Sequence, residues 1–388
     1  MSEAYDIAIV GAGPGGSSAA IRLAQSGKRV VLIEKEKFPR QKLCGEFISP
    51  ECLEHFAELG VLDRMQGAGG VEISETVFYS RGGRGVVVPS AMFGGLHQNA
   101  LGLSRAEMDL QLMLRARDAG VEVREQTSTA APIIENGRVS GITIKNDCGQ
   151  GIVASPVIID ATGRTRALAR KLASGSPSTR AEAVAFKTHV RNVDIPNDRC
   201  EIFSYRGGYG GTSRVEDGLY NICFIAAASD VKTLASDPSR VFREVVCSNR
   251  RAAHVFRNVE FVDTWLAVSI ERFGGRILSP VQGLLTVGDA AAFIDPFTGS
   301  GMLLALESGK IAAECILDTP DLATLATEYE RRYAAAFDNR LRICAWLRRA
   351  SFVPFLADLT ILGLSLSSTL KDHIVRATRA EKRGPNPG

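Results

Sequence analysis

A chain of 388 residues exceeds the length at which one hydrophobic core stops growing, about 250 to 300 residues, so we expect two folding units. Hydrophobic residues make up 45% and charged residues 23%, which is usual for a globular chain and excludes wholesale disorder. The formal net charge is only +3, with Lys and Arg spread along the chain, and this excludes nucleic acid as a favoured partner.

Cysteine usage and the N-terminus bear on the compartment. The eight cysteines contain no CxxC pair, and the chain lacks the charged, apolar and cleavage regions of a secretory signal. Both features predict free thiols in a reducing, cytoplasmic setting.

The first elements in chain order are a strand, a tight turn, a helix and a second strand. Residues 5–10 and 29–34 are largely apolar, residues 11–16 are rich in glycine, and residues 17–25 have a helical pattern. This order predicts one βαβ unit of a parallel sheet.

The middle of the chain extends that sheet and then leaves it. Residues 104–119 are apolar at helical spacing, and residues 121–124 resume a strand. Residues 133–146 and 151–159 alternate around two turn signals and predict a small antiparallel ribbon that leads back into the sheet.

The second half predicts another sheet and a return to the first. Residues 183–264 hold short alternating segments broken by glycines, which indicate a mostly antiparallel sheet that we interpret as the substrate domain. A strand at 284–287 and a helix at 301–317 complete the first domain, and helical patterns follow at 323–350 and 356–377.

The glycine-rich turn is the first motif that carries chemistry. Residues 11–16 read Gly-Ala-Gly-Pro-Gly-Gly between a strand and a helix, so the backbone can approach a pyrophosphate at the helix N-terminus. Glu34 ends the second strand, where it can accept hydrogen bonds from the adenosine ribose hydroxyls. The sequence therefore predicts a dinucleotide site in a Rossmann-like domain.

A second motif selects FAD over NAD. Asp289 ends a late strand, where its carboxylate can bind ribityl hydroxyls, which NAD lacks. A new helix N-terminus near residues 299–302 can stabilise negative charge at the flavin N1 and C2 oxygen when the ring is reduced.

Four segments resemble one known superfamily over about residues 5 to 317. It comprises FAD-dependent enzymes: aromatic hydroxylases related to p-hydroxybenzoate hydroxylase, flavin-dependent halogenases and geranylgeranyl reductases. The segments are the Gly-Asp at 288–289, Asp-Ala-Thr-Gly-Arg at 160–164, Leu-Ser-Arg-Ala-Glu-Met-Asp at 103–109, and Phe-Pro-Arg-Gln-Lys-Leu-Cys-Gly at 38–45. The last is most similar to the geranylgeranyl reductase branch.

The resemblance implies which residues surround the cofactor. It places the 160–164 motif near the FAD pyrophosphate and brings Arg105 to the FAD, and it directs Cys44 towards the substrate. Cys44 is therefore a candidate catalytic residue, with a small buried thiol as the alternative. The residues that we expect to bind FAD are Gly11, Gly13, Pro14, Gly15, Gly16, Glu34, Lys35, Arg40, Cys44, Gly45, Arg105, Val123, Asp160, Gly163, Gly288, Asp289, Pro296, Gly299, Ser300, Gly301 and Met302.

Two departures limit the resemblance. Residues 208–215 lack most of the aromatic and proline positions typical of prenyl reductases, and neither Trp265 nor Trp346 lies in the paired-tryptophan motif of halogenases. No metal site is expected. The histidines are dispersed and are interpreted as structural or surface residues: His55, His97, His189, His254 and His373.

The predicted activity is that of an FAD-dependent monooxygenase acting on an aromatic or apolar small molecule through a flavin C4a-hydroperoxide, with NAD(P)H as reductant. The alternative is reduction of a carbon-carbon double bond, as in geranylgeranyl reductases. A flavin-bearing electron-transfer protein is a third hypothesis. Oligomeric state, substrate and nicotinamide preference stay open.

Contact with a membrane surface also stays open. Residues 352–366 are apolar but interrupted, and they are either a helix packed on its own core or one resting on a membrane. The arginines that precede them are Arg340, Arg342, Arg348 and Arg349.

The predicted organisation is therefore α/β, with a discontinuous FAD-binding domain, a mostly antiparallel substrate domain and C-terminal helices. The expected boundaries are 1–75, 100–180 and 270–317 for the FAD-binding domain, 76–99 and 181–269 for the substrate domain, 318–380 for the helical region and 381–388 for a disordered tail.

Overall fold

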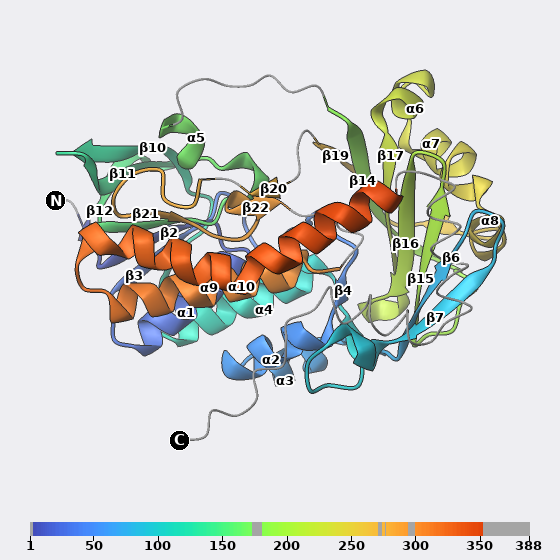
Figure 1. The fold of residues 1–388 in the computed structure, drawn as a ribbon, viewed down its shortest axis with the longest axis horizontal. Coiled ribbons are helices and arrows are strands. Elements are labelled where there is room, and N and C mark those ends of the chain that lie inside the picture. The colour runs from blue at the N-terminus through green and yellow to red at the C-terminus, as the bar shows by residue number, and fades with distance from the viewer. Residues whose placement is uncertain (1–2, 173–180, 271–273, 276, 294–298, 352–388) are drawn as a thin grey trace.

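The computed structural model describes residues 3–172, 181–270, 274–275, 277–293 and 299–351. Two sheet assemblies lie side by side in it (Figure 1). The parallel sheet is at the left of that view and the larger, mostly antiparallel sheet at the right.

The parallel sheet has five short strands in the order β21-β13-β2-β3-β9. Every residue of β2, β3, β13 and β21 is buried, so these strands have nearly continuous apolar sequences instead of an alternating pattern. The Rossmann-type fold predicted from the sequence is confirmed. The strand bounds are β2 (Ile7–Val10), β3 (Val30–Ile33), β9 (Glu122–Arg124), β13 (Val157–Asp160) and β21 (Leu284–Thr286).

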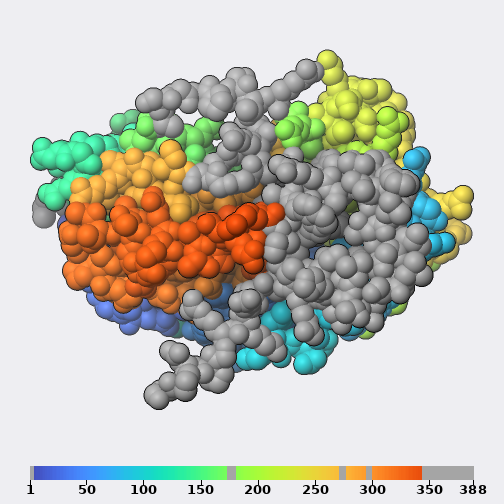
Figure 2. Space-filling view, in the orientation of Figure 1, coloured from blue at the N-terminus to red at the C-terminus, as the bar shows by residue number. Residues whose placement is uncertain are grey.

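Helices cover one face of this sheet. Ile7 and Ile9 of β2 share a hydrophobic core with residues of several helices, and α9 lies directly against α1. The space-filling view shows α9 and α10 on the surface of this half (Figure 2). The helices are α1 (Pro14–Gln25), α4 (Arg105–Asp118), α9 (Gly301–Asp318) and α10 (Leu322–Ser351).

A small antiparallel sheet covers the opposite face. Ala8 and Val10 of β2 pack there against Val139, Ile142 and Val153. The predicted ribbon is thus confirmed, and the N-terminal strand joins it in parallel. Its strands are β1 (Glu3–Ala4), β10 (Ser128–Glu135), β11 (Arg138–Asn146) and β12 (Gly149–Ala154), and α5 (Ala169–Leu172) follows β13.

The second assembly is an eight-stranded sheet with two unlike faces. One face carries the aromatic residues of a core shared with three short helices: Phe186, Phe203, Phe224, Phe242 and Phe256. The strands are β6 (Glu75–Tyr79), β7 (Gly85–Pro89), β14 (Ala183–Arg191), β15 (Arg199–Tyr205), β16 (Gly208–Arg214), β17 (Tyr220–Ala227), β18 (Glu260–Phe261) and β19 (Leu266–Ile270). The helices are α6 (Ala228–Thr233), α7 (Pro238–Glu244) and α8 (Arg250–Val255).

A three-stranded sheet joins the two halves. Gly102 on its central strand lies so close to β16 that a Cβ there would be 2.0 Å from the Arg214 carbonyl oxygen. The bounds are β4 (Phe47–Ile48), β5 (Val71–Ile73) and β8 (Ala100–Gly102), with α2 (Pro50–Glu58) and α3 (Leu62–Gly67) between them; β20 (Gly274–Gly275) pairs with β22 (Ala292–Phe293).

The C-terminal helix α10 packs on α9 through Tyr329, Tyr333 and Phe337. Arg340, one of the arginines that precede residues 352–366, is buried and paired with Glu51 of α2. Residues 352–366 and the predicted helix 356–377 lie outside the described residues. Within the described ranges, no helix is long and apolar enough to cross a membrane.

The contact of α9 with α1 depends on Gly309. A Cβ at this position would be 2.3 Å from the Gly15 carbonyl oxygen and 3.1 Å from Ser18 Cβ. We expect Gly309→Ala to lower the free energy of unfolding by about 1–3 kcal/mol, because the obstacle is rigid backbone. Urea unfolding measures this. Gly67→Ala is the control, since Gly67 ends α3 with no atom within 4 Å of its Cβ position; an equal loss there would contradict the packing argument.

Candidate FAD site

The glycine turn after β2 separates into packing positions and open positions. A Cβ at Gly11 would be 2.4 Å from the Ala161 carbonyl oxygen, and one at Gly16 would be 1.9 Å from the Gly11 carbonyl oxygen. At Gly13, in contrast, the nearest atom is a guanidinium nitrogen of Arg105 at 3.9 Å. The turn is therefore closed against its own strands and open on the side of Arg105.

Two helices begin at this open side without a side-chain cap. Gly13 precedes α1, which starts at Pro14 and has no acidic residue in its first turn. Ser300 precedes α9, which begins at Gly301 and also lacks a side-chain cap and an early acidic residue. Both N-termini therefore retain the partial positive charge that favours an anion.

Glu34 lies at the end of β3, as expected, and is buried. Its carboxylate accepts the Ala12 backbone N–H at 3.0 Å and pairs with Arg40 at 3.3 Å. The carboxylate is thus already held against the glycine turn. Lys35 is exposed and pairs with Glu36, and Val123 is half-buried on β9, so the assignment of these two residues to FAD stays a prediction.

Asp109 organises the cations of the site, which the sequence analysis did not recognise. Its fully buried carboxylate pairs with Arg40 at 2.8 Å and with Arg105 at 2.8 Å. Burial would lower the pKa of Arg105, but Asp109 and the neighbouring Cys44 raise it above its usual value. The four-residue spacing of Arg105 and Asp109 on one helix was the signal available in the sequence.

Asp289 follows β21, and three cations surround it. Burial raises the pKa of the Asp289 carboxyl, and the charges of Arg164, Arg105 and Lys42 oppose that rise. Gly288 donates its N–H to Ser308 Oγ of α9 at 2.8 Å, which fixes this turn against the helix. The second motif is therefore brought beside the first.

Asp160 is occupied within its own turn. Its carboxylate accepts hydrogen bonds from the Thr162 hydroxyl at 2.6 Å and from the Ala169 backbone N–H at 2.9 Å, besides the N–H groups of Thr162 and Leu168. This carboxylate shapes the loop that presents Gly163. Direct contact of Asp160 with FAD stays a prediction.

The residues present fit FAD. A Cβ at Gly45, Gly163, Gly299 or Gly301 would meet no atom of the described residues within 4 Å, so the described part of the chain leaves room beside each of these backbones. Three cations, two uncapped helix N-termini and one carboxylate converge on the same region. Ser300 and Met302 are buried at the start of α9, and Pro296 lies outside the described residues.

Cys44 lies where the cofactor half meets the eight-stranded sheet. Its half-buried side chain is beside Arg105, and its carbonyl oxygen accepts a hydrogen bond from Asn221 Nδ2 at 3.0 Å. The Cys44 Sγ accepts the Glu46 N–H at 3.4 Å. The loop thus carries Cys44 to the face of the sheet opposite the aromatic core.

Two neighbouring groups on that face were not predicted. One is a polar cluster of Glu46, Lys187, His189 and Asp263. Lys187 and His189 are two positions apart on β14 and share a face, which was the only sequence signal. The other is apolar and joins Leu43 and Phe293 of the cofactor half to Ala183, Ala185, Tyr209, Ile225 and Ile270.

His189 lies between two carboxylates. Its Nε2 is 2.7 Å from Glu46 Oε2 and its Nδ1 is 2.8 Å from Asp263 Oδ2. Burial would lower the pKa of His189, but Glu46 and then Asp263 raise it above its usual value. Burial would likewise raise the pKa of Glu46, and Lys187 and His189 hold it below its usual range. His189 is thus buried and paired at both ring nitrogens, so of the two interpretations made from the sequence the structural one fits and the surface one does not.

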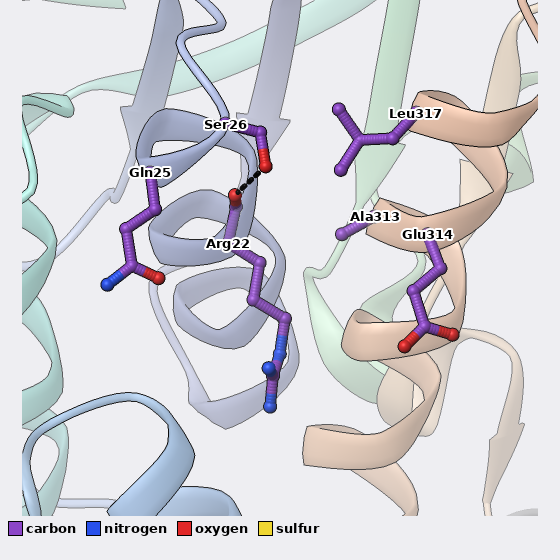
Figure 3. A pocket seen from close by; sticks show the side chains of 6 residues that line it. All are labelled: Arg22, Gln25, Ser26, Ala313, Glu314 and Leu317. Atoms are coloured by element: carbon purple, nitrogen blue, oxygen red, sulfur yellow. Dashed lines mark hydrogen bonds between the residues drawn. The ribbon is translucent and has the colours of Figure 1, made fainter. Parts of the chain in front are cut away.

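A separate hollow of about 250 Å³ lies on the surface between α1 and α9 (Figure 3). Arg22 and Ser26 line it at the end of α1, and Ala313, Glu314 and Leu317 line it from α9. Because the glycine turn is at the opposite end of α1, this hollow is not part of the cofactor site.

The fold and this site define an FAD-binding oxidoreductase. Residues 4–309 match the family described as FAD binding domain, and the chain belongs to that family. It is 28% identical to digeranylgeranylglycerophospholipid reductase 2 of Methanopyrus kandleri, over 87% of this chain and 84% of that protein. It is 27% identical to menaquinone reductase of Mycobacterium tuberculosis, over 94% and 90% respectively. The solved structure of a geranylgeranyl bacteriochlorophyll reductase-like protein from Thermoplasma acidophilum aligns with a TM-score of 0.80 at 22% identity, over 99% and 97%.

Asp289→Ala tests the placement of the ribityl end. Loss of a charged acceptor is expected to weaken FAD binding about 10- to 100-fold, the equivalent of roughly 1.5–3 kcal/mol, while ADP affinity is retained. Calorimetric titration of the apoprotein with FAD and with ADP measures both. Asp118→Ala, at a surface ion pair with Arg64, is the control. Loss of ADP affinity with normal FAD affinity would contradict the placement.

His189→Gln tests the charge state of the polar cluster. A raised folded-state pKa contributes stability that is complete below the unfolded value, about 6.5, and is lost as pH rises through the folded pKa. The stability difference between the native protein and the variant should therefore be largest near pH 6 and decline towards pH 9. Denaturant unfolding of the apoprotein measures it. His254→Gln, on the surface, is the control. A difference independent of pH would show that folding does not raise the pKa of His189.

Proposed function

We propose that the protein is an FAD-dependent reductase that saturates carbon-carbon double bonds in the isoprenoid chain of a lipid, with NAD(P)H as the source of electrons. The observation that carries the proposal is the apolar cluster between Leu43 and Phe293 of the cofactor half and the inner face of the eight-stranded sheet. A long hydrocarbon chain is the type of ligand that such a surface binds without unpaired polar groups.

Small side chains on that face favour a chain-like substrate. Ala183 and Ala185 alternate on β14, and Gly211 and Ser213 alternate on β16. The two alanines and Ser213 are small, whereas the opposite face of the sheet is filled by phenylalanines. At Gly211 the side chain of Ile202 takes up the space, with its Cδ1 2.5 Å from the Cβ position. The names of the relatives, reductases of a geranylgeranyl phospholipid and of menaquinone, support an isoprenoid substrate.

When bound, FAD would supply hydride transfer, and the protein's own residues would bind, orient and exclude water. The cations near Asp289 would hold the pyrophosphate and ribityl regions. The apolar cluster would keep water from the reacting carbon, and Cys44 would border the same space from the loop.

Monooxygenation, the activity first predicted from the sequence, requires an electron-rich carbon in a comparable apolar setting. No contact among the described residues favours an aromatic substrate over an alkene. Reduction is preferred here because of the relatives' names and the small side chains on β14 and β16. A lipid substrate would also bring the protein to a membrane surface, although residues 352–366 lie outside the described part of the chain.

The test is a single turnover without oxygen. FAD-loaded protein is reduced with NADH, NADPH or dithionite and then mixed with digeranylgeranylglycerophospholipid in detergent micelles. The flavin should reoxidise, and mass spectrometry should detect product with two added hydrogens per double bond. In a second experiment, oxygen is admitted to the reduced protein together with an aromatic probe. If the flavin is reoxidised only by oxygen and an oxygen atom is inserted into the probe, monooxygenation replaces the proposal.

A further inference from the structure

The polar cluster on β14 reaches from the surface into the interior. The side chain of Asp263 is 41% exposed, whereas those of His189, Glu46 and Lys187 are 3%, 0% and 2% exposed. Each of the four is joined to the next: Asp263 to His189 at 2.8 Å, His189 to Glu46 at 2.7 Å, and Glu46 to Lys187 by a short hydrogen bond. These four titratable groups therefore form one continuous hydrogen-bonded line from the solvent to the interior.

The hydrogen bonds set the protonation of the line. Ionised carboxylates only accept hydrogen bonds, so an imidazole between Asp263 and Glu46 donates from both nitrogens and carries two protons. Two carboxylates then balance the two cations, His189 and Lys187. Such an imidazolium can give a proton to Glu46 from Nε2 and regain one through Nδ1 from the exposed side.

Lys187 is the inner end of the line. Its ammonium has three hydrogens, and the described residues provide two acceptors, Glu46 and the Gln41 amide oxygen at 2.8 Å. Lys187 shares a strand face with Ala183 and Ala185, which belong to the apolar cluster. The Lys187 ammonium, with its third N–H, therefore lies at the edge of the space proposed for the substrate.

We propose that Lys187 delivers the proton that alkene reduction consumes, and that Asp263, His189 and Glu46 form the path that restores it from solvent. This inference rests on the proposed function. One alkene carbon accepts hydride from the reduced cofactor, and the other accepts H⁺ from Lys187 Nζ as the π bond is lost. His189 then gives its Nε2 proton to Glu46, Glu46 passes a proton to Lys187, and solvent reprotonates His189 beside Asp263, so atoms and charge balance.

Other groups near the line come from several elements. Asn221 and Cys223 on β17 pair in register with His189 and Lys187, the backbone N–H of Arg105 donates to Glu46 at 2.7 Å, and Gln41 comes from the loop. None of these four groups is an ionised acid. Glu46 and Asp263 are thus the anions that govern proton transfer through His189.

Two variants test the path at its ends, each in the anaerobic single turnover with digeranylgeranylglycerophospholipid. Lys187→Met should slow flavin reoxidation about 10²- to 10⁴-fold, the range for loss of a positioned acid. Asp263→Asn, at the exposed end, should fold normally and slow turnover several-fold, with the decline at high pH starting at a lower pH because His189 loses one neighbouring anion. Glu201→Gln is the control: it removes a buried carboxylate paired with Arg251 on the aromatic face and should leave the rate unchanged.

A titration of the apoprotein gives a readout independent of activity. The NMR-measured pKa of His189 should fall in Asp263→Asn and rise in Lys187→Met. If the native protein reduces no alkene probe, the proposed function fails. If it does, while Lys187→Met and Asp263→Asn both keep the native rate and pH profile, the proton path is refuted. Should Lys187→Met fail to fold, Asp263→Asn decides alone.

Discussion

Glu46 joins the two halves of the protein through one buried carboxylate. It accepts the backbone N–H that opens α4 on the cofactor side and pairs with Lys187 and His189 on the sheet. A fully buried carboxylate is tolerated only when partners replace its hydration, so loss of any one partner is destabilising. Its backbone has a φ of 53°, a conformation uncommon for a residue with a side chain. The surrounding contacts therefore hold this residue in place against local preference.

The position of the candidate FAD site relative to the sheet depends on these contacts of Glu46. The loop that ends in Glu46 also carries Cys44, whose carbonyl oxygen is bound by Asn221 of the sheet, and α4 carries Arg105 towards the glycine turn. Asp109 then links Arg105 and Arg40 to the same helix. This short series of contacts connects the sheet to Arg105 and Arg40. A shift of the sheet would therefore also move the cations that face the FAD site.

The sequence predicted the parts of the site that depend on local backbone. The glycine turn, Glu34 and Asp289 follow directly from strand ends, where neighbouring residues determine the geometry. It did not predict Asp109 as the organiser of two arginines, nor the pairing of Glu46 with His189. Those contacts join residues 69 and 143 positions apart in the chain. Periodicity identifies which face a residue occupies, but it carries no information about which distant face will meet it.

The two faces of the eight-stranded sheet explain why the 208–215 segment departs from the prenyl reductase pattern without loss of the sheet. Stability is supplied on the outer face, where phenylalanines from three strands and two helical segments stack. On the inner face, β16 contributes Tyr209 to the apolar cluster, and Gly211 makes room for Ile202 of β15, whose Cδ1 is 2.5 Å from the Gly211 Cβ position. Buried Ser213 Oγ and Asn221 Oδ1 have no hydrogen-bond partner among the described residues, although buried polar atoms are normally paired. The inner face therefore combines a packed apolar cluster with polar atoms that the described residues leave unpaired, whereas the outer face is wholly aromatic and aliphatic at its core.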